Sequence, residues 1–366
     1  MGTKSQILTL MSVSLSASVS AACSSQSNEL ILNAGKSPSH PETMRPSPVL
    51  PSEPSGANES AHQNDSDATQ TTPPAPPNLC NANALPRKQT LDVQYQQLSN
   101  VDPNLQSLDI YFPAVENPCQ GVPVVIWIHG GAWMLGDKAN VDSKAKAEHF
   151  NLLGYGFVSV NYRLSPDLRI DSRLNPNRIK FPDHPNDVGA AVAWIHKNIK
   201  KFGGDNQKLA LLGHSAGAHL AALVSQDQSY IQKADPTWDP KSLRCLGSYD
   251  TEGYNISTLM QQAGGQTRLI YRNAFGDDPA QWSAASPINF VKEYGMAIQL
   301  AKRGEQDRQT QLENFKIALE GKGNKVSVIN AQTLTHEEVN RVIGALGDTV
   351  MTPYVTDFIT KSCFPK

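Results

Sequence analysis

Residues 209–224 read LALLGHSAGAHLAALV. An apolar run, as expected of a buried strand, leads into the pentapeptide GHSAG at 213–217, and small apolar residues follow it. A G-x-S-x-G pattern between a strand and a helix is typical of a sharp turn that lifts a serine hydroxyl out of the backbone. The glycines permit this turn, because a Cβ at either place would crowd the strand and the helix. We therefore interpret Ser215 as a candidate nucleophile.

A second motif lies upstream, where residues 122–133 read VPVVIWIHGGAW. The apolar part predicts a buried strand over 122–128, and two glycines in the loop after it let the backbone approach a ligand closely. Backbone N–H groups of such a loop stabilise an oxyanion together with the N–H that follows the serine. The expected donors are Gly131, Ala132 and Ala216.

Further segments follow in a fixed order. They are VNYRLSP at 160–166, FPDHPNDVGAAVAWIHKN at 181–198, FGGD at 202–205 and AFGDDPAQWSAASPINFV at 274–291. With the two motifs above, they resemble the α/β-hydrolase carboxylesterases of the His-Gly-Gly type, near the feruloyl-esterase-like and kynurenine-formamidase-like branch. The resemblance covers most of residues 90–366. It implies an α/β-hydrolase fold, hydrolytic chemistry without a cofactor, and a bracing role for His129 and Gly130 in the oxyanion loop.

The acid of a catalytic triad follows the serine and precedes the histidine in this fold. Residues 296–301 (MAIQLA) predict a late core strand, and carboxylates follow it at the edge where parallel sheets carry their functional groups. The resemblance places the acid three residues after Gly304, which selects Asp307. Glu305 is the alternative.

The histidine is expected after the last strand, predicted at 325–329. His336 comes seven residues beyond that strand, where it would accept the proton of Ser215 as general base. His214 and His219 flank the serine turn, and we interpret them as packing or hydrogen-bonding residues.

Alternating strand-like and helix-like runs predict one α/β domain over residues 85–366, with a mostly parallel central sheet flanked by helices. Its clearest helix is predicted at 187–199. Residues 249–295 separate two core strands and are expected to form a small cap. The other strands are predicted at 107–112, 157–161, 209–212 and 243–248.

The first 84 residues have a different composition. Residues 1–22 resemble a secretory signal that ends before Cys23, with Ser20-Ala21-Ala22 preceding the cysteine as in bacterial lipoproteins. Acylated Cys23 would be the only attachment to a membrane, on its periplasmic or cell-surface face. Signal cleavage near Ala22, giving a soluble exported protein, is the alternative. Residues 23–84, rich in Ser and Pro, predict a disordered tether.

Five cysteines are present, and acylation of Cys23 leaves four that would pair in an oxidising compartment. Three connectivities are possible. We favour Cys80 with Cys119 and Cys245 with Cys363, since each pair would tie a terminus to the fold.

Charge and motifs exclude other classes. The formal net charge is −2, from 32 basic and 34 acidic residues, which argues against a nucleic-acid partner. Metal-ligand spacings such as H-E-x-x-H or C-x-x-C are absent from the sequence. We expect a serine hydrolase of short-acyl or aryl esters whose partner is a small-molecule ester. The alternatives are an aryl formamidase and a surface binding protein that keeps the fold without turnover.

Overall fold

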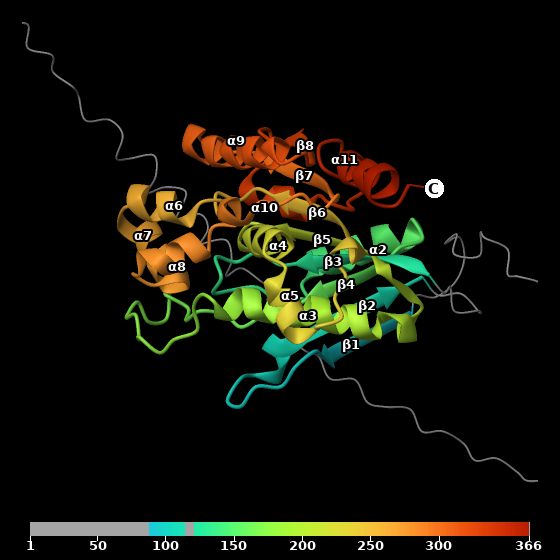
Figure 1. Ribbon diagram of the computed structural model, residues 1–366, viewed down its shortest axis with the longest axis horizontal. Helices are drawn as coiled ribbons and strands as arrows, with labels where there is room; N and C mark the ends of the chain where they lie inside the picture. The colour runs from blue at the N-terminus through green and yellow to red at the C-terminus, as the bar shows by residue number, and fades with distance from the viewer. Residues whose placement is uncertain (1–87, 114–120, 366) are drawn as a thin grey trace, which may run out of the picture.

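The computed structural model describes residues 88–113 and 121–365 (Figure 1). The expected signal, the tether, Cys23 and the pair Cys80 and Cys119 lie outside these residues.

The described chain forms an eight-stranded sheet in the order β1-β2-β4-β3-β5-β6-β7-β8. β2 pairs antiparallel with β1 and β4, and the remaining neighbours are parallel. This mostly parallel sheet with flanking helices is an α/β-hydrolase fold, as predicted. The strands are β1 (Lys88–Gln94), β2 (Ser107–Phe112), β3 (Val122–Ile128), β4 (Gly156–Val160), β5 (Gly204–His214), β6 (Leu243–Tyr249), β7 (Ala297–Lys302) and β8 (Lys325–Asn330).

The predicted strands agree with these bounds to within a residue at most ends, and β5 is the main exception. β5 begins at Gly204 and not at residue 209, because its first residues are polar and only partly buried, so no apolar run marks them. Gly203 has a φ of 92°, ends the preceding helical turn and lets the chain enter the strand. β1, at the edge of the sheet, was not predicted.

Helices cover both faces of the sheet, because alternate residues of each strand point to opposite sides. Val124 and Ile126 of β3 pack in a core with α3 (Asp183–Asn198), α4 (Ala216–Gln226) and α9 (Gln306–Gly321). Val125 and Trp127 pack on the other face with α2 (Val141–Leu152), α10 (His336–Arg341), α11 (Thr352–Asp357) and the π-helix η5 (Phe358–Cys363). The central strands are therefore buried on both faces.

The clearest predicted helix begins earlier than expected. α3 starts at Asp183, four residues before the predicted start at Asp187, and ends at Asn198. Its apolar positions Val188, Val192 and Ile195 are fully buried, which is the periodicity that predicted it.

Three short helices lie between β6 and β7, in the segment predicted to form a cap, and this segment is called the cap below. They are α6 (Ile256–Gln262), α7 (Gly265–Phe275) and α8 (Pro279–Ala284), which lie together at the left of Figure 1. The remaining helical segments are α5 (Ser229–Ala234), η1 (Pro103–Gln106), η2 (Ile199–Phe202), η3 (Pro240–Ser242) and η4 (Pro287–Phe290).

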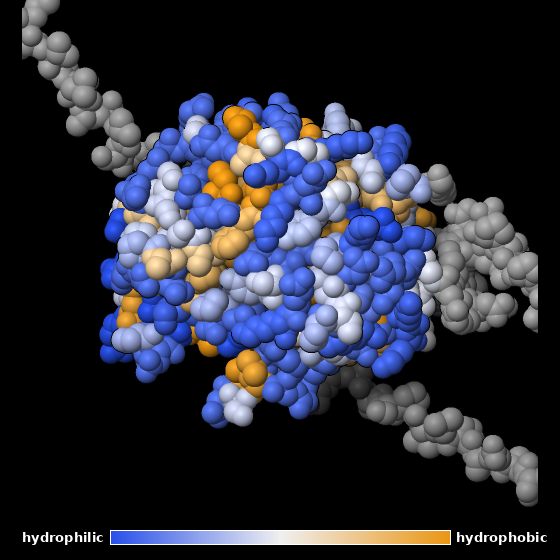
Figure 2. Space-filling view, in the orientation of Figure 1, coloured by the Kyte–Doolittle hydropathy of each residue, from blue (hydrophilic) through white to orange (hydrophobic). Residues whose placement is uncertain are grey.

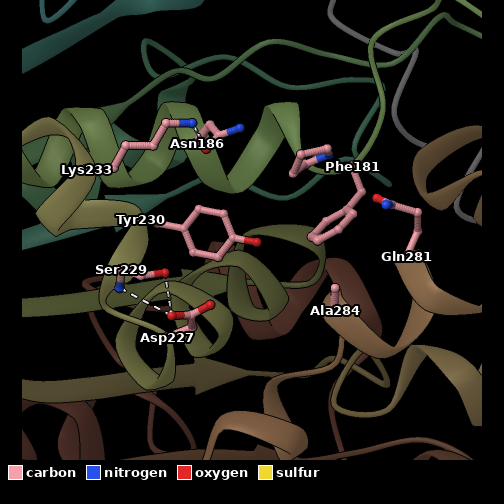
Figure 3. A pocket seen from close by; sticks show the side chains of 9 residues that line it. Phe181, Asn186, Asp227, Ser229, Tyr230, Lys233, Gln281 and Ala284 are labelled. Carbon is pink, nitrogen blue, oxygen red and sulfur yellow. Dashed lines mark hydrogen bonds between the residues drawn. The ribbon is translucent and has the colours of Figure 1, made fainter.

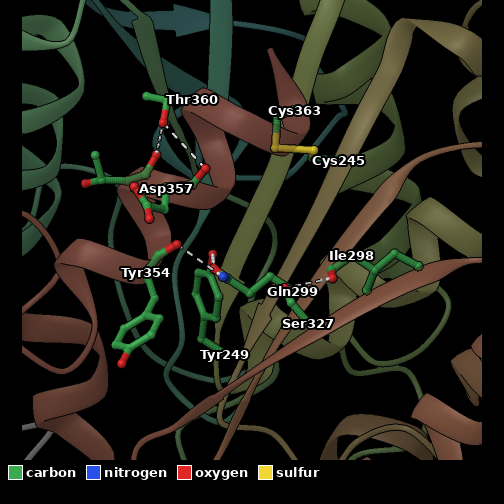
Figure 4. The surroundings of a disulfide bond; sticks show 10 residues. Cys245, Tyr249, Ile298, Gln299, Ser327, Tyr354, Asp357, Thr360 and Cys363 are labelled. Carbon is green, nitrogen blue, oxygen red and sulfur yellow. Dashed lines mark hydrogen bonds between the residues drawn. A yellow bond between two sulfur atoms is a disulfide. The ribbon is translucent and has the colours of Figure 1, made fainter. Parts of the chain in front are cut away.

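A disulfide joins Cys245 to Cys363, as predicted. It ties the end of η5 to the middle of the sheet at β6 (Figure 4). Among the described residues, no helix has both the length and the apolar character needed to cross a membrane. The face seen in Figure 2 is mostly hydrophilic, with limited apolar patches.

Candidate active site

Ser215 lies in the sharp turn between β5 and α4. Its φ of 55° and ψ of −122° are unusual for a residue with a side chain, and its N–H donates to Tyr249 O at 3.0 Å. A Cβ on Gly213 would lie 2.4 Å from Gly217 O, and one on Gly217 would lie 2.2 Å from Ile128 O. Both glycines are therefore required by the close packing of strand, helix and oxyanion loop, as the pentapeptide predicted.

A hydrogen-bonded line of three side chains starts at this serine. Ser215 Oγ lies 2.8 Å from His336 Nε2, and His336 Nδ1 lies 2.7 Å from Asp250 Oδ2. A carboxylate only accepts, so Nδ1 carries the proton and Nε2 is left to accept from the serine hydroxyl. The line therefore has the geometry of a nucleophile, a base and an acid that orients the base.

His336 is the first residue of α10. Its position is fixed by the preceding Thr335, which caps the helix and forms a capping box with Glu338. The structure thus brings together two of the three predicted triad residues, Ser215 and His336.

The third predicted residue, Asp307, is not part of this line. Asp307 lies exposed in the first turn of α9, and its alternative Glu305 is the exposed N-cap of the same helix. The carboxylate beside His336 is Asp250, directly after β6. The prediction of the acid is therefore corrected to Asp250.

The physical reason lies in the sheet. β6 and β7 are parallel neighbours, with Tyr249 opposite Ala301, so both strands deliver residues to the same edge. The chain turns at Asp250, whose φ is 54°, and the end of β7 presents arginines there instead. A usable signal was present in the sequence, because Asp250 follows a predicted strand and lies between Ser215 and His336 in chain order.

Asp250 is ionised although it is fully buried. Burial alone would raise the pKa of its carboxyl group, but Arg308, His336 and Arg303 hold it well below its usual value. Arg308 Nε lies 2.6 Å from Oδ1, and Arg303 Nε lies 2.5 Å from Oδ2.

The oxyanion loop has a strained backbone. Gly131, Ala132 and Trp133 have φ values of 114°, 52° and 59°, three successive left-handed residues. Within the described residues, the N–H groups of Gly131 and Ala132 have no hydrogen-bond acceptor. A Cβ on Gly130 would lie 3.1 Å from Ser215 Cβ, so the loop lies directly against the serine.

The third expected donor, Ala216, opens α4, where the first amides lack an acceptor within the helix. The three amides therefore flank Ser215, on the loop and at the start of the helix.

His129 braces the oxyanion loop through its hydrogen bonds and ring contact. Its Nδ1 lies 2.7 Å from Gly130 O, and its ring stacks on Tyr162 with centroids 4.5 Å apart. Tyr162 O–H donates to His129 O at 3.1 Å. Burial lowers the pKa of His129, so the ring stays neutral and donates to the carbonyl. These contacts match the bracing arrangement that the resemblance implied.

Two other histidines support the site without touching the reacting atoms. His214 Nε2 lies 2.9 Å from His336 O, and burial lowers its pKa well below the usual value. His219 accepts from Trp133 Nε1 at 3.2 Å and donates from Nε2 to Ala285 O at 2.8 Å. Burial lowers the pKa of His219 to about 4, so it remains a neutral bridge between oxyanion loop and cap.

Aromatic side chains join the oxyanion loop to the cap. Trp133 meets Phe275 and Tyr271 of α7 at centroid distances of 4.8 and 6.2 Å. All three are buried. Aromatic packing therefore joins the oxyanion loop to α7.

His214, Asp250 and His336 offer possible ligand atoms within 4.8 Å of one another. Both ring nitrogens of His336 are already engaged, and two guanidinium groups lie on Asp250. A cation here would meet these positive charges, so the cluster suits proton transfer better than metal binding.

A separate open recess of about 350 Å³ lies elsewhere on the surface (Figure 3). The side chains of Phe181 and Tyr230 face it, and none of the three site residues lines it.

Comparison with known proteins shows the family of the chain. Residues 108–317 match the BD-FAE family. Esterase LipQ of Mycobacterium tuberculosis is 31% identical over 195 residues, covering 50% of this chain and 42% of LipQ. Esterase LipC of the same organism is 29% identical over 196 residues, covering 52% of this chain and 45% of LipC. The chain thus spans less than half the length of these two relatives.

Among solved structures, a truncated carbohydrate esterase from gut microbiota has a TM-score of 0.58 at 19% identity. The superposition covers 76% of this chain and 97% of that one. At this identity the similarity shows the fold.

Proposed function

The chain belongs to the BD-FAE family, and from this premise we propose that it hydrolyses carboxylic esters through an acyl-enzyme on Ser215. The observation that carries the proposal is the line from Ser215 through His336 to Asp250. The names of its esterase relatives support the same class of reaction.

The geometry supports a two-step reaction. His336 Nε2 takes the proton of Ser215 as Oγ bonds to the ester carbonyl carbon, and the carbonyl oxygen becomes an oxyanion. Collapse breaks the bond to the alcohol, which leaves with the proton from Nε2. Water then attacks the acyl-enzyme by the same route and releases the acid and free Ser215. Asp250 keeps the imidazole in the required tautomer throughout.

For the substrate, we propose short-acyl or aryl esters. Trp133 of the oxyanion loop packs against Phe275 and Tyr271 of the cap, and these aromatic side chains support a substrate with a flat or compact group. Each buried CH₂ of an acyl chain helps by about 0.8 kcal/mol only while the pocket has room. We therefore expect acetyl to butyryl aryl esters to be hydrolysed ahead of chains of about twelve carbons or more.

A fluorophosphonate probe tests the mechanism. The wild type should be labelled, and Ser215→Ala should lose both labelling and ester hydrolysis across the whole acyl series. Labelling that persists in Ser215→Ala would assign the nucleophile elsewhere. A folded, unlabelled and inactive wild type would favour the binding-protein alternative.

The aryl formamidase alternative uses the same three side chains, so the substrate panel includes an N-formyl aryl amine. Strong turnover of this amide with weak ester hydrolysis would favour it. A specificity constant that keeps rising to palmitoyl esters would instead indicate a lipase.

A further inference from the structure

Two arginines hold the carboxylate of Asp250. Arg303 follows β7 and Arg308 lies in the first turns of α9, so both come from the strand end where the sequence suggested the acid itself. Arg303 Nε contacts Oδ2, the oxygen that also accepts from His336. Arg308 Nε contacts Oδ1, and its Nη2 donates to the backbone oxygen of Asp250 at 2.6 Å.

The two arginines also compensate the buried charge of Asp250, which the hydrogen bond from His336 alone would not do. A carboxylate has about four acceptor sites, and His336 occupies one of them. A buried charge is tolerated when the remaining sites are hydrogen-bonded and the charge is compensated. Asp250 is fully buried, and the two guanidinium side chains are each 14% exposed.

Arg308 also links the acid to the cap. Its Nη1 contacts Glu252 Oε2. Glu252 Oε1 accepts from the hydroxyl of Tyr271 at 2.6 Å, and Tyr271 lies on α7 beside Trp133 of the oxyanion loop. Through Glu252 and Tyr271, the Arg308 guanidinium therefore connects the Asp250 carboxylate with Trp133 of the oxyanion loop.

We propose that Arg303 and Arg308 are positioning residues for ester hydrolysis: they lock the Asp250 carboxylate that orients His336, and Arg308 places a positive charge beside the imidazole. This inference rests on the proposed function of Ser215. The two arginines act through Asp250 and His336.

The charge effect follows from one distance. Arg308 Nη2 lies 3.4 Å from His336 Nδ1, and because both atoms carry protons this contact is not a hydrogen bond. A guanidinium this close disfavours the imidazolium. Asp250 and the ring of His214 from β5 also contact the histidine. Behind them, Arg303 contacts Asp250, Glu252 contacts Arg308, and the charge of Lys146 from α2 acts on His214.

The test measures kcat and kcat/KM on an aryl acetate from about pH 5 to 9, the range in which a histidine base titrates. In Arg308→Gln the loss of a nearby positive charge should move the acidic limb of kcat/KM up by about one pH unit. Its plateau kcat should fall by about tenfold or more, because the carboxylate is no longer fixed. Arg308→Lys keeps the charge but not the fork geometry, so it should lower kcat while leaving the limb near its wild-type position.

Arg272→Gln is the matched control, because Arg272 pairs with Asp277 at the surface and should leave both quantities unchanged. If folded Arg308→Gln has the same acidic limb in its pH profile of kcat/KM and the same plateau kcat as the wild type, the proposal is wrong. If that variant does not fold, Arg308→Lys and Arg303→Gln decide, and wild-type kcat in both overturns it. A wild type that the fluorophosphonate probe does not label would contradict both the proposed function and this inference. A labelled wild type, together with arginine variants whose kcat and pH profile are unchanged, would contradict this inference alone.

Discussion

Asp250 Oδ2 accepts a hydrogen bond from His336 Nδ1 at 2.7 Å, across 86 positions of the chain. Asp250 follows β6, whereas His336 opens α10 beyond β8, so two strands of the sheet separate their elements in sequence. This contact fixes the tautomer that leaves Nε2 facing Ser215. The acid of the proposed triad is therefore supplied by β6.

Exchange of the acid tests this assignment. Asp250→Asn should lower kcat by about four orders of magnitude, because the amide no longer favours the tautomer that accepts from Ser215. Asp307→Asn, on an exposed helical turn, should stay within about twofold of the wild type, as surface changes usually do. The measurement is kcat on an aryl acetate, with thermal unfolding to confirm that both variants fold. The reverse order of effects would restore Asp307.

We expect the stability of the fold to depend on pH through Lys146. Burial lowers its pKa to about 7, whereas an unfolded lysine has a pKa of about 10.4. Between these values the folded chain binds fewer protons than the unfolded chain, so the contribution of Lys146 to stability rises with pH. The slope is at most about 1.4 kcal/mol per pH unit.

Lys146→Met should remove this slope. The free energy of unfolding of the wild type, relative to the variant, should increase from neutral to alkaline pH in denaturant titrations. Parallel pH curves for the two proteins would contradict a neutral buried lysine. Lys146 Nζ also donates to Asn340 O of α10 at 2.7 Å. The variant therefore also removes a hydrogen bond to the helix that carries His336.

The disulfide between Cys245 and Cys363 closes a loop with a sequence separation of 118. Replacing both cysteines by alanine should lower the free energy of unfolding by about 2–5 kcal/mol, mainly because the unfolded chain gains freedom. Thermal unfolding with and without a reductant checks this. A reductant should destabilise the wild type and leave the double variant unchanged, and equal responses would contradict the bond.

The membrane anchor stays a prediction from the sequence around Cys23, outside the described residues. Cys23→Ser should move the protein from the membrane to the soluble fraction and leave its hydrolytic activity intact, because the predicted tether separates the cysteine from the fold. Cell fractionation checks this, with hydrolytic activity measured in each fraction. Wild-type protein that is wholly soluble would exclude the anchor.

The local features of this site can be predicted from the amino-acid sequence. The apolar runs before His129 and Ser215 specify buried strands, and the glycines at 131, 213 and 217 stand where a Cβ would clash with neighbouring atoms. The periodicity of α3 and the order of strands and helices specify the fold class. These features depend on neighbours in the chain, so a pattern of a few residues records them.

The identity of the carboxylate that contacts His336 depends on contacts between distant parts of the chain. Parallel strands bring the ends of β6 and β7 to one edge of the sheet. Asp250 and Asp307 each follow one of these strands, so their positions in the sequence suit the role of the acid equally well. The choice depends on the left-handed turn at Asp250 and on the arginines that compensate its buried charge. Such a contact joins residues far apart in the chain through packing and electrostatics, and no local pattern encodes it.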